Sequence, residues 1–413
     1  MKLQRFLVIA LLTAAWGCSG RCGAGGAGDQ ATVAPPTVAP ALRPLPDPTR
    51  VELAAPTATG ARRFQLPHGE ELLAVAATAD GRALVALSPT RAYFFDADAD
   101  TGRSVKLPAL VTAPVVVALS STRVAVLSVA PTTPPDGRLH LVDAARPDEP
   151  TSVTLGGAPV FAALLQGGRL AVVLREPPAL AIHDAASGER IALHTLPRVP
   201  ARLEVAPDGS WAAVAATGND EGAGGVVTVD VAGPEPVFAF VSLGASAPTD
   251  TAARRPLLAL PTRDALLVAG QAADGRPFAL VVPRAGGEPL AGLELGAGRL
   301  LGAARAGDRL VLFTEEPGVG HRTYVFGAAD HAVRSVIADG PSNPRASVVE
   351  HAGALFVPRC HDLLELDLAA GSSRVVHEAR ALRAGSCLTG LWRLGERIVF
   401  AEPNQLVVWA PPR

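Results

Sequence analysis

Tyr93-Phe94-Phe95-Asp96 is an apolar run, typical of a β-strand, that ends at an aspartate where the chain is expected to turn. Similar runs recur along the chain, and the aspartates that end the first four are 47, 41 and 46 residues apart. The eight copies are Tyr93-Phe94-Phe95-Asp96, Leu141-Val142-Asp143, Ala181-Ile182-His183-Asp184, Thr228-Val229-Asp230, Leu280-Val281-Val282, Tyr324-Val325-Phe326, Leu364-Glu365-Leu366-Asp367 and Val407-Val408-Trp409. A period of roughly 40 to 50 residues, with several short strands in each repeat, is the signature of a β-propeller. The sequence therefore predicts an all-β propeller.

The first repeat shows the expected blade most clearly. Its strands are predicted at 72–78, 83–87, 92–96 and 104–107, with a tight turn at Asp80-Gly81. The same succession returns at 160–165, 169–174, 179–184 and 190–196, and again at 203–206, 211–216, 225–231 and 237–243. The first strand of the first repeat is apolar at successive positions, which fits burial between adjacent blades.

The two ends of the repeat region predict how the ring closes. The last apolar run ends at Trp409, which leaves the final blade without an outer strand. Residues 61–67 resemble 102–108, the outer strand of the first blade, so we expect residues 62–66 to complete the last blade and cover its unpaired edge. This arrangement gives eight blades. Seven is the alternative if the irregular region 244–299 is not a blade.

Two short motifs resemble those of known propeller repeats. Residues 205–209, Val-Ala-Pro-Asp-Gly, with the apolar residues 212–215, resemble the repeat of WD40-like and YVTN-type propellers. Residues 184–189, Asp-Ala-Ala-Ser-Gly-Glu, resemble the turn of PQQ-like propeller repeats. The tryptophan that usually follows that turn is missing, because Ile191-Ala192-Leu193 stands in its place. We therefore predict no quinone cofactor, and the sequence points to no other cofactor.

The N-terminus has the features of an export signal. A short basic region, Lys2 and Arg5, precedes the apolar stretch 6–16, which is too short to span a bilayer and fits a secretory signal peptide. Ala15-Trp16-Gly17-Cys18 resembles the lipobox of bacterial lipoproteins, although Ala15 and Trp16 depart from the usual leucine and small residue. The resemblance implies that Cys18 is the site of lipid attachment. An ordinary signal peptide cleaved near Gly17 or Gly20 is the alternative.

The segment after Cys18 predicts a tether. Ser19 resembles the residue found in lipoproteins sorted to the outer membrane, where the protein would face the periplasm or the cell surface. Gly23–28 is rich in glycine, and prolines recur up to residue 48, so this stretch cannot bury enough apolar surface to order itself. The predicted organisation is a lipoprotein signal peptide at 1–17, a disordered tether at 18–60 and a propeller at 61–413.

Composition narrows the classes of partner. The chain has 413 residues and a formal net charge of −2, with no basic stripe, which argues against nucleic acid. Aromatic residues make up 4% of the chain, too few for the stacking platforms that sugars and single-stranded nucleic acids generally require.

Polar loops on one face of the ring are the candidate binding site. In a propeller, the loops between second and third strands share a face with the links between blades. The charged residues expected on that face are Asp220, Glu221, Arg254, Arg255, Glu315, Glu316, His321, Arg345, Arg359 and His361. Ordinary solvated loops are the alternative interpretation of these charges.

The sequence lacks common motifs of catalytic, metal-binding and nucleotide-binding sites. It contains no H-E-x-x-H set, no G-x-S-x-G elbow and no P-loop, and it predicts no catalytic residue. Cys360 and His361 with Cys387 lack the fourth ligand that a zinc site usually needs, so no metal site is predicted. Because an exported protein can form disulfides, we predict a bond between Cys360 and Cys387, with two free thiols as the alternative.

These features together predict a membrane-anchored propeller that binds another envelope protein as a scaffold. The lipobox, the propeller repeats and the Asp-Ala-x-Ser-Gly turn resemble the lipoprotein propeller of the outer-membrane barrel-assembly machinery, a resemblance that implies a protein partner in the envelope. A propeller enzyme, such as a lactonase or a quinoprotein-like dehydrogenase, is the alternative, and it would require metal-binding carboxylates, asparagines or histidines around the channel.

Overall fold

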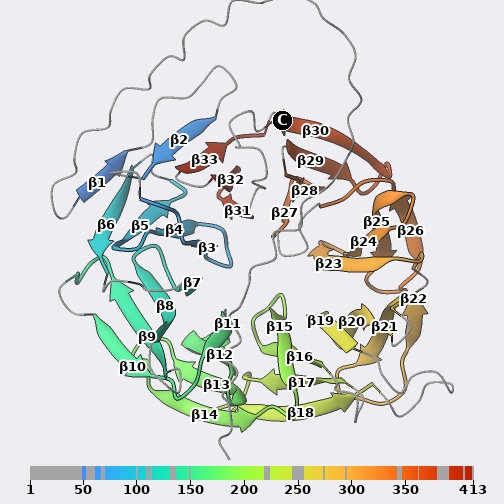
Figure 1. Ribbon diagram of the computed structural model, residues 1–413, viewed down its shortest axis with the longest axis horizontal. Coiled ribbons are helices and arrows are strands. Elements are labelled where there is room, and N and C mark those ends of the chain that lie inside the picture. Colours follow the sequence, from blue (N-terminus) through green and yellow to red (C-terminus); the bar gives the residue numbers. More distant parts are fainter. Residues whose placement is uncertain are drawn as a thin grey trace, which may run out of the picture. The chain divides into compact units, whose positions relative to one another are not determined.

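Eight antiparallel sheets, arranged as the blades of a propeller, make up the part of the chain that the computed structural model describes (Figure 1). The described residues are 49–52, 61–66, 70–98, 101–107, 110, 114–130, 136–147, 150–217, 224–243, 255–272, 275–293, 295–341, 347–360, 362–378, 390–402 and 405–411. They all belong to one compact unit, 42–413. Within them, the only helical element is the short 3-10 turn Gln166–Gly168, and none is a helix able to span a membrane.

Each of the first four blades is built from consecutive strands. Blade 1 contains β3 (Ala74–Ala77), β4 (Ala83–Leu87), β5 (Arg91–Asp96) and β6 (Thr101–Lys106); blade 2 contains β7 (Val115–Ala118), β8 (Arg123–Ala130), β9 (Asp136–Asp143) and β10 (Thr151–Thr154); blade 3 contains β11 (Pro159–Leu165), β12 (Arg169–Arg175), β13 (Pro178–Asp184) and β14 (Arg190–Thr195); blade 4 contains β15 (Val199–Val205), β16 (Trp211–Thr217), β17 (Gly225–Asp230) and β18 (Val237–Ser242).

The remaining blades follow the same order, except that the last borrows a strand. Blade 5 contains β19 (Arg255–Pro261), β20 (Ala265–Gln271), β21 (Pro277–Pro283) and β22 (Ala291–Leu293); blade 6 contains β23 (Arg299–Ala306), β24 (Arg309–Glu316), β25 (Gly320–Gly327) and β26 (Val333–Ile337); blade 7 contains β27 (Val349–His351), β28 (Ala354–Pro358), β29 (Asp362–Asp367) and β30 (Ser372–Glu378); blade 8 contains β31 (Leu391–Leu394), β32 (Arg397–Glu402), β33 (Gln405–Trp409) and β2 (Arg62–Gln65). The region 244–299 therefore does contain a blade, and the eight-bladed prediction is confirmed.

Strand β2 closes the ring as the sequence predicts. It pairs antiparallel with β33, with Arg62 opposite Val408 and Gln65 opposite Gln405. Its one deeply buried residue, Phe64, packs against Tyr93 and Phe95 of blade 1, with ring centroids 5.2 and 5.1 Å apart. The strand thus belongs to blade 8 through its backbone and to the blade 8–blade 1 interface through its side chain.

One further strand lies before the predicted start of the propeller. Strand β1 (Thr49–Glu52) pairs antiparallel with the outer strand β6, so blade 1 has five strands. The prediction of disorder over 18–60 is therefore wrong for residues 49–52. The rest of that segment, the signal sequence and Cys18 lie outside the described residues.

The core is divided into eight apolar clusters, one at each interface between neighbouring blades. The middle strands supply most of it: all five residues of β4 and six of the seven residues of β16 are buried. Burial of apolar surface at every interface, including that between blades 8 and 1, is the main force that holds the ring closed.

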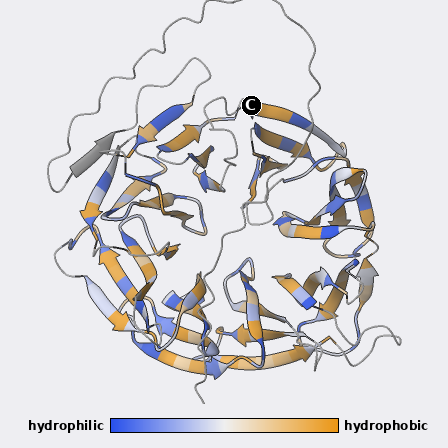
Figure 2. Cartoon of the chain, in the orientation of Figure 1, coloured by the Kyte–Doolittle hydropathy of each residue, from blue (hydrophilic) through white to orange (hydrophobic). Residues whose placement is uncertain are grey.

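Outer strands are more exposed. Figure 2 shows the apolar character of β18, where Val237 and Phe240 face solvent.

Arginines add a repeated polar link between blades. Arg123 at the start of β8 donates to the Ala186 carbonyl oxygen of blade 3, and Arg169 at the start of β12 donates to the Val231 carbonyl oxygen of blade 4. Arg397 at the start of β32 makes the same kind of bond to a carbonyl oxygen of blade 1. The blade 8–blade 1 interface therefore carries the same link as interfaces within the continuous chain.

Candidate functional site

Several loops of blades 5 and 6 surround an open hollow on the face that the sequence singled out. It has a volume of about 870 Å³. Its lining residues are Gly275, Arg276, Gly298, Arg299, Glu315, Glu316, Pro317, Gly318, Val319 and Gly320. They come from the loop between β20 and β21, the link into β23 and the turn between β24 and β25, so the expected grouping of these loops on one face is observed.

Glu315 and Glu316 both line this hollow but serve different purposes. Glu315 is half-buried, with its side chain 43% exposed, and accepts hydrogen bonds from Nε and Nη2 of Arg299, the residue opposite it on β23. Exposed ion pairs of this kind contribute little stability. They leave charged side chains at the rim of the hollow that solvent can reach.

The Glu316 side chain is turned inward and only 8% of the residue is exposed. Its Oε1 accepts a hydrogen bond from the Tyr324 hydroxyl at 2.5 Å, and its Oε2 lies 2.9 Å from Nε of Arg322. A Cβ on Gly296 would lie 2.2 Å from the Glu316 carboxylate, so the absence of a side chain there makes room for the acid. Glu316 therefore anchors the turn 317–319 rather than facing a ligand.

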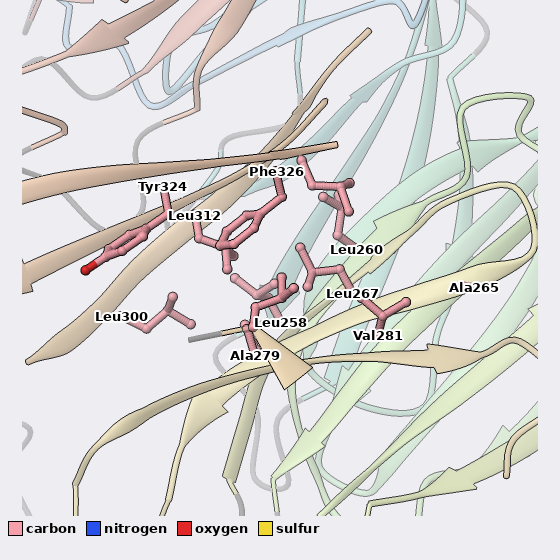
Figure 3. Close-up of a cluster of buried hydrophobic side chains, with 13 residues drawn as sticks. Leu258, Leu260, Ala265, Leu267, Ala279, Val281, Leu300, Leu312, Tyr324 and Phe326 are labelled. Atoms are coloured by element: carbon pink, nitrogen blue, oxygen red, sulfur yellow. The ribbon is translucent and has the colours of Figure 1, made fainter. Parts of the chain in front are cut away.

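Tyr324 connects this anchor to the core. Its ring lies in the apolar cluster between blades 5 and 6, and its hydroxyl points away from that cluster (Figure 3). The hydroxyl also accepts a hydrogen bond from the Gly296 amide at 2.9 Å. Burial, together with the hydrogen bond to Glu316, raises the pKa of Tyr324, so the hydroxyl keeps its proton and remains a donor to the carboxylate.

A second polar group lies on the same face between blades 6 and 7. Arg359 pairs with Asp362 through Nε at 2.5 Å, and its Nη1 lies 3.2 Å from Oδ1 of Asp339. The hydrogen bonds to Asp362 raise the pKa of Arg359 above its already high ordinary value. Asp339 is held in turn by its carbonyl oxygen, which accepts a hydrogen bond from the Thr323 hydroxyl at 2.6 Å. Thr323 follows Arg322, so a chain of polar contacts runs from Glu316 to Arg359.

The other predicted face residues are placed less centrally. His321 on β25 is half-buried beside Gly340, and Arg255 is exposed at the start of β19. Neither lines the hollow. Asp220, Glu221, Arg254, Arg345 and His361 lie outside the described residues.

Five residues of these polar groups were not predicted as site residues from the sequence: Arg276, Arg299, Arg322, Tyr324 and Asp339. Tyr324 was noted only as part of a predicted strand. Arg276 and Arg299 face one hollow although 23 positions separate them, and no local pattern announces such a meeting. Only Asp339 had a local signal, because Asp339-Gly340-Pro341 is a turn sequence in a link between blades.

Cys360 lies directly after the loop residue Arg359 and is disulfide-bonded. Its predicted partner, Cys387, lies outside the described residues, so the pairing of these two cysteines stays a prediction.

Metal-binding geometry is not found in the part of the chain that the structure describes, where no three His, Cys, Asp or Glu side chains are grouped to hold an ion. Arginine and glutamate side chains surround a broad hollow, and Val319, 54% exposed, adds an apolar contact at its edge.

Comparison with known proteins supports the fold. No family model matches the chain, and no curated protein is similar to it in sequence. Among solved structures, the computationally designed Ika8 protein is similar over 84% of this chain and 98% of its own, with 12% identity and a TM-score of 0.61. The Cps50 (Swd1) β-propeller domain of Myceliophteria thermophila is similar over 70% of this chain and 93% of its own, with 14% identity and a TM-score of 0.49. At 12% identity, the likeness to Ika8 concerns the fold alone.

Proposed function

We propose that this protein is a lipid-anchored propeller of the cell envelope that binds another envelope protein as a scaffold. The rim of the hollow between blades 5 and 6 is the observation that supports protein binding. Arg276, Arg299 and Glu315 surround an open volume of about 870 Å³. Arginine is enriched at protein interfaces, and interface rims are polar. Val319 adds an exposed apolar contact at the edge of the hollow.

The anchoring half of the proposal depends on the N-terminal sequence. Cys18 in its lipobox-like setting would carry the lipid, and about 0.8 kcal/mol per buried methylene makes several acyl chains a durable anchor. The segment between Cys18 and β1 would then act as the tether. The lipid and the tether would hold the loops of blades 5 and 6 near the membrane, where they could bind a partner in the same compartment.

Charge reversal at the rim tests the protein-binding half. Glu315→Lys places a second positive charge beside Arg299 without touching the buried core, so we expect the native complex solubilised from membranes to lose its partner and migrate at a smaller size. Asp308→Lys is the matched control, because Asp308 lies in the turn between β23 and β24 of the same blade and its side chain is 97% exposed. Unchanged migration of the Glu315→Lys complex, or equal losses in both variants, contradicts the proposal.

A further inference from the structure

A second, smaller cavity lies at the inner ends of blades 4 to 6. Its volume is about 220 Å³. Its lining comes from the inner strands β15, β19 and β23, from Phe313 of β24, and from Pro341, Ser347 and Val348 of the link into blade 7. Figure 1 shows these inner strands nearest the centre of the ring. This cavity has no lining residue in common with the hollow between blades 5 and 6.

Arg305 is the unusual member of this lining. Its Nε donates to the Gly307 carbonyl oxygen at 3.2 Å, whereas its Nη1 is buried and has no hydrogen-bond partner among the residues that the structure describes. The nearby carboxylate of Glu350 accepts a hydrogen bond from the Gly307 amide at 2.8 Å and does not fill the place beside Nη1. Buried polar atoms almost always have partners, so this donor requires an explanation.

The other charges in the cavity balance each other. Nε of Arg202 lies 2.5 Å from Oε1 of Glu204, two positions along the same strand. The described lining therefore contains two arginines and one glutamate, and that glutamate pairs with Arg202 rather than with Arg305. Burying an N–H group of a guanidinium without a partner is costly unless an acceptor meets it.

Apolar surface completes the cavity. Leu260, Leu301 and Phe313 are buried residues of its lining. At about 220 Å³, the cavity is smaller than the roughly 300–1,000 Å³ that drug-sized ligands usually occupy. Its occupant must therefore be small, anionic at one end and apolar at the other.

We propose that this cavity binds a small organic carboxylate, whose anionic end pairs with the Arg305 guanidinium and whose apolar body contacts Leu260, Leu301 and Phe313. A carboxylate suits the guanidinium because two of its N–H groups can donate to the two carboxylate oxygens. The site is independent of the proposed protein-binding face and of the membrane anchor.

Titration of purified full-length protein with benzoate tests the proposal. Benzamide, the neutral analogue of the same shape, and acetate, which lacks an apolar body, are the reference ligands. We expect benzoate to bind, as measured by calorimetry, and to raise the thermal midpoint with concentration. Acetate should bind more weakly, and benzamide should have no effect. Absence of benzoate binding, or equal binding of benzamide, overturns the proposal whatever the variants show.

Variants then locate the site. Arg305→Gln should weaken benzoate binding by about tenfold or more, because it removes a charge-assisted contact. The exposed Arg82→Gln, remote in blade 1, should leave it unchanged. A merely structural role for Arg305 predicts a less stable ligand-free protein, whereas an uncompensated charge predicts that the ligand-free Arg305→Gln protein melts at the same temperature or higher. Equal benzoate affinity of Arg305→Gln and the parent protein overturns the assignment.

Discussion

Aspartates at the ends of third strands have one physical role that repeats around the ring. In blades 1 to 4 and 7, Oδ1 of the aspartate accepts a hydrogen bond from the backbone amide two residues later, at 2.8 to 3.0 Å. Such a side-chain bond stabilises the turn into the outer strand. The pattern that reveals the repeat in the sequence is therefore a turn signal, and it is readable because both partners are local.

Asp184 allows this role to be measured. The Ser187 amide and hydroxyl, with smaller help from the Ala186 amide, lower its pKa below the ordinary value of 3.8. A lowered folded-state pKa means that the charged carboxylate stabilises the fold above about pH 4 and that this contribution disappears as pH falls through the folded pKa. Asp184→Ala should therefore cost about 0.5–2 kcal/mol of unfolding free energy at neutral pH, by analogy with helix caps.

Urea unfolding of Asp184→Ala and the parent protein from pH 7 down to pH 3 checks this. The exposed Asp308→Ala serves as the control and should change little. The difference between Asp184→Ala and the parent should shrink towards the acid end. A difference that grows as pH falls would show that the carboxylate does not act through its charge.

The site, in contrast, could be predicted only in part at the level of residues. Glu315, Glu316 and Arg359 lie on the expected face, yet Glu316 is buried under Tyr324 and Arg322 rather than presented to solvent. Which charged side chain turns inward depends on cross-strand neighbours and on space left by Gly296. These groups are far apart in the sequence, so no local sequence pattern reveals that they are in contact.

Strands and blades were the most predictable level. The predicted strands of blade 1 and the closing strand follow from apolar alternation, turn residues and the likeness of 61–67 to 102–108. Strand β1 was missed because the proline-rich sequence around it outweighs four residues of strand character. Its pairing partner is the free outer edge of β6, which only the folded blade provides.

At the scale of the strands, the testable prediction concerns Phe64 on the closing strand β2. The residue is 3% exposed and contacts both Tyr93 and Phe95 across the blade 8–blade 1 interface. Phe64→Ala should reduce the free energy of unfolding by about 3–5 kcal/mol. Arg63→Ala, at the exposed neighbouring position of the same strand, is the control, and thermal melting compares them. Equal midpoints for the two variants would mean that β2 does not hold the ring closed.

The whole molecule combines a ring that closes on its own N-terminal strand with a predicted lipid at Cys18. If that cysteine carries the anchor, Cys18→Ala should move the protein from the membrane pellet to the soluble fraction, because the remaining chain lacks acyl chains. Fractionation with mass spectrometry of the mature N-terminus checks this. An unmodified N-terminus downstream of Cys18 in the parent protein would contradict it.

The central claim is that the face at blades 5 and 6 binds a protein partner, and site-specific photo-crosslinking in intact membranes tests it most directly. A photoreactive residue at Val319 lies at the edge of the hollow, and the same residue at Asp308 lies in the opposite turn of the same blade. We expect one discrete adduct of constant mass from position 319 and none from position 308. No adduct from 319, or the same adducts from both positions, would contradict the account.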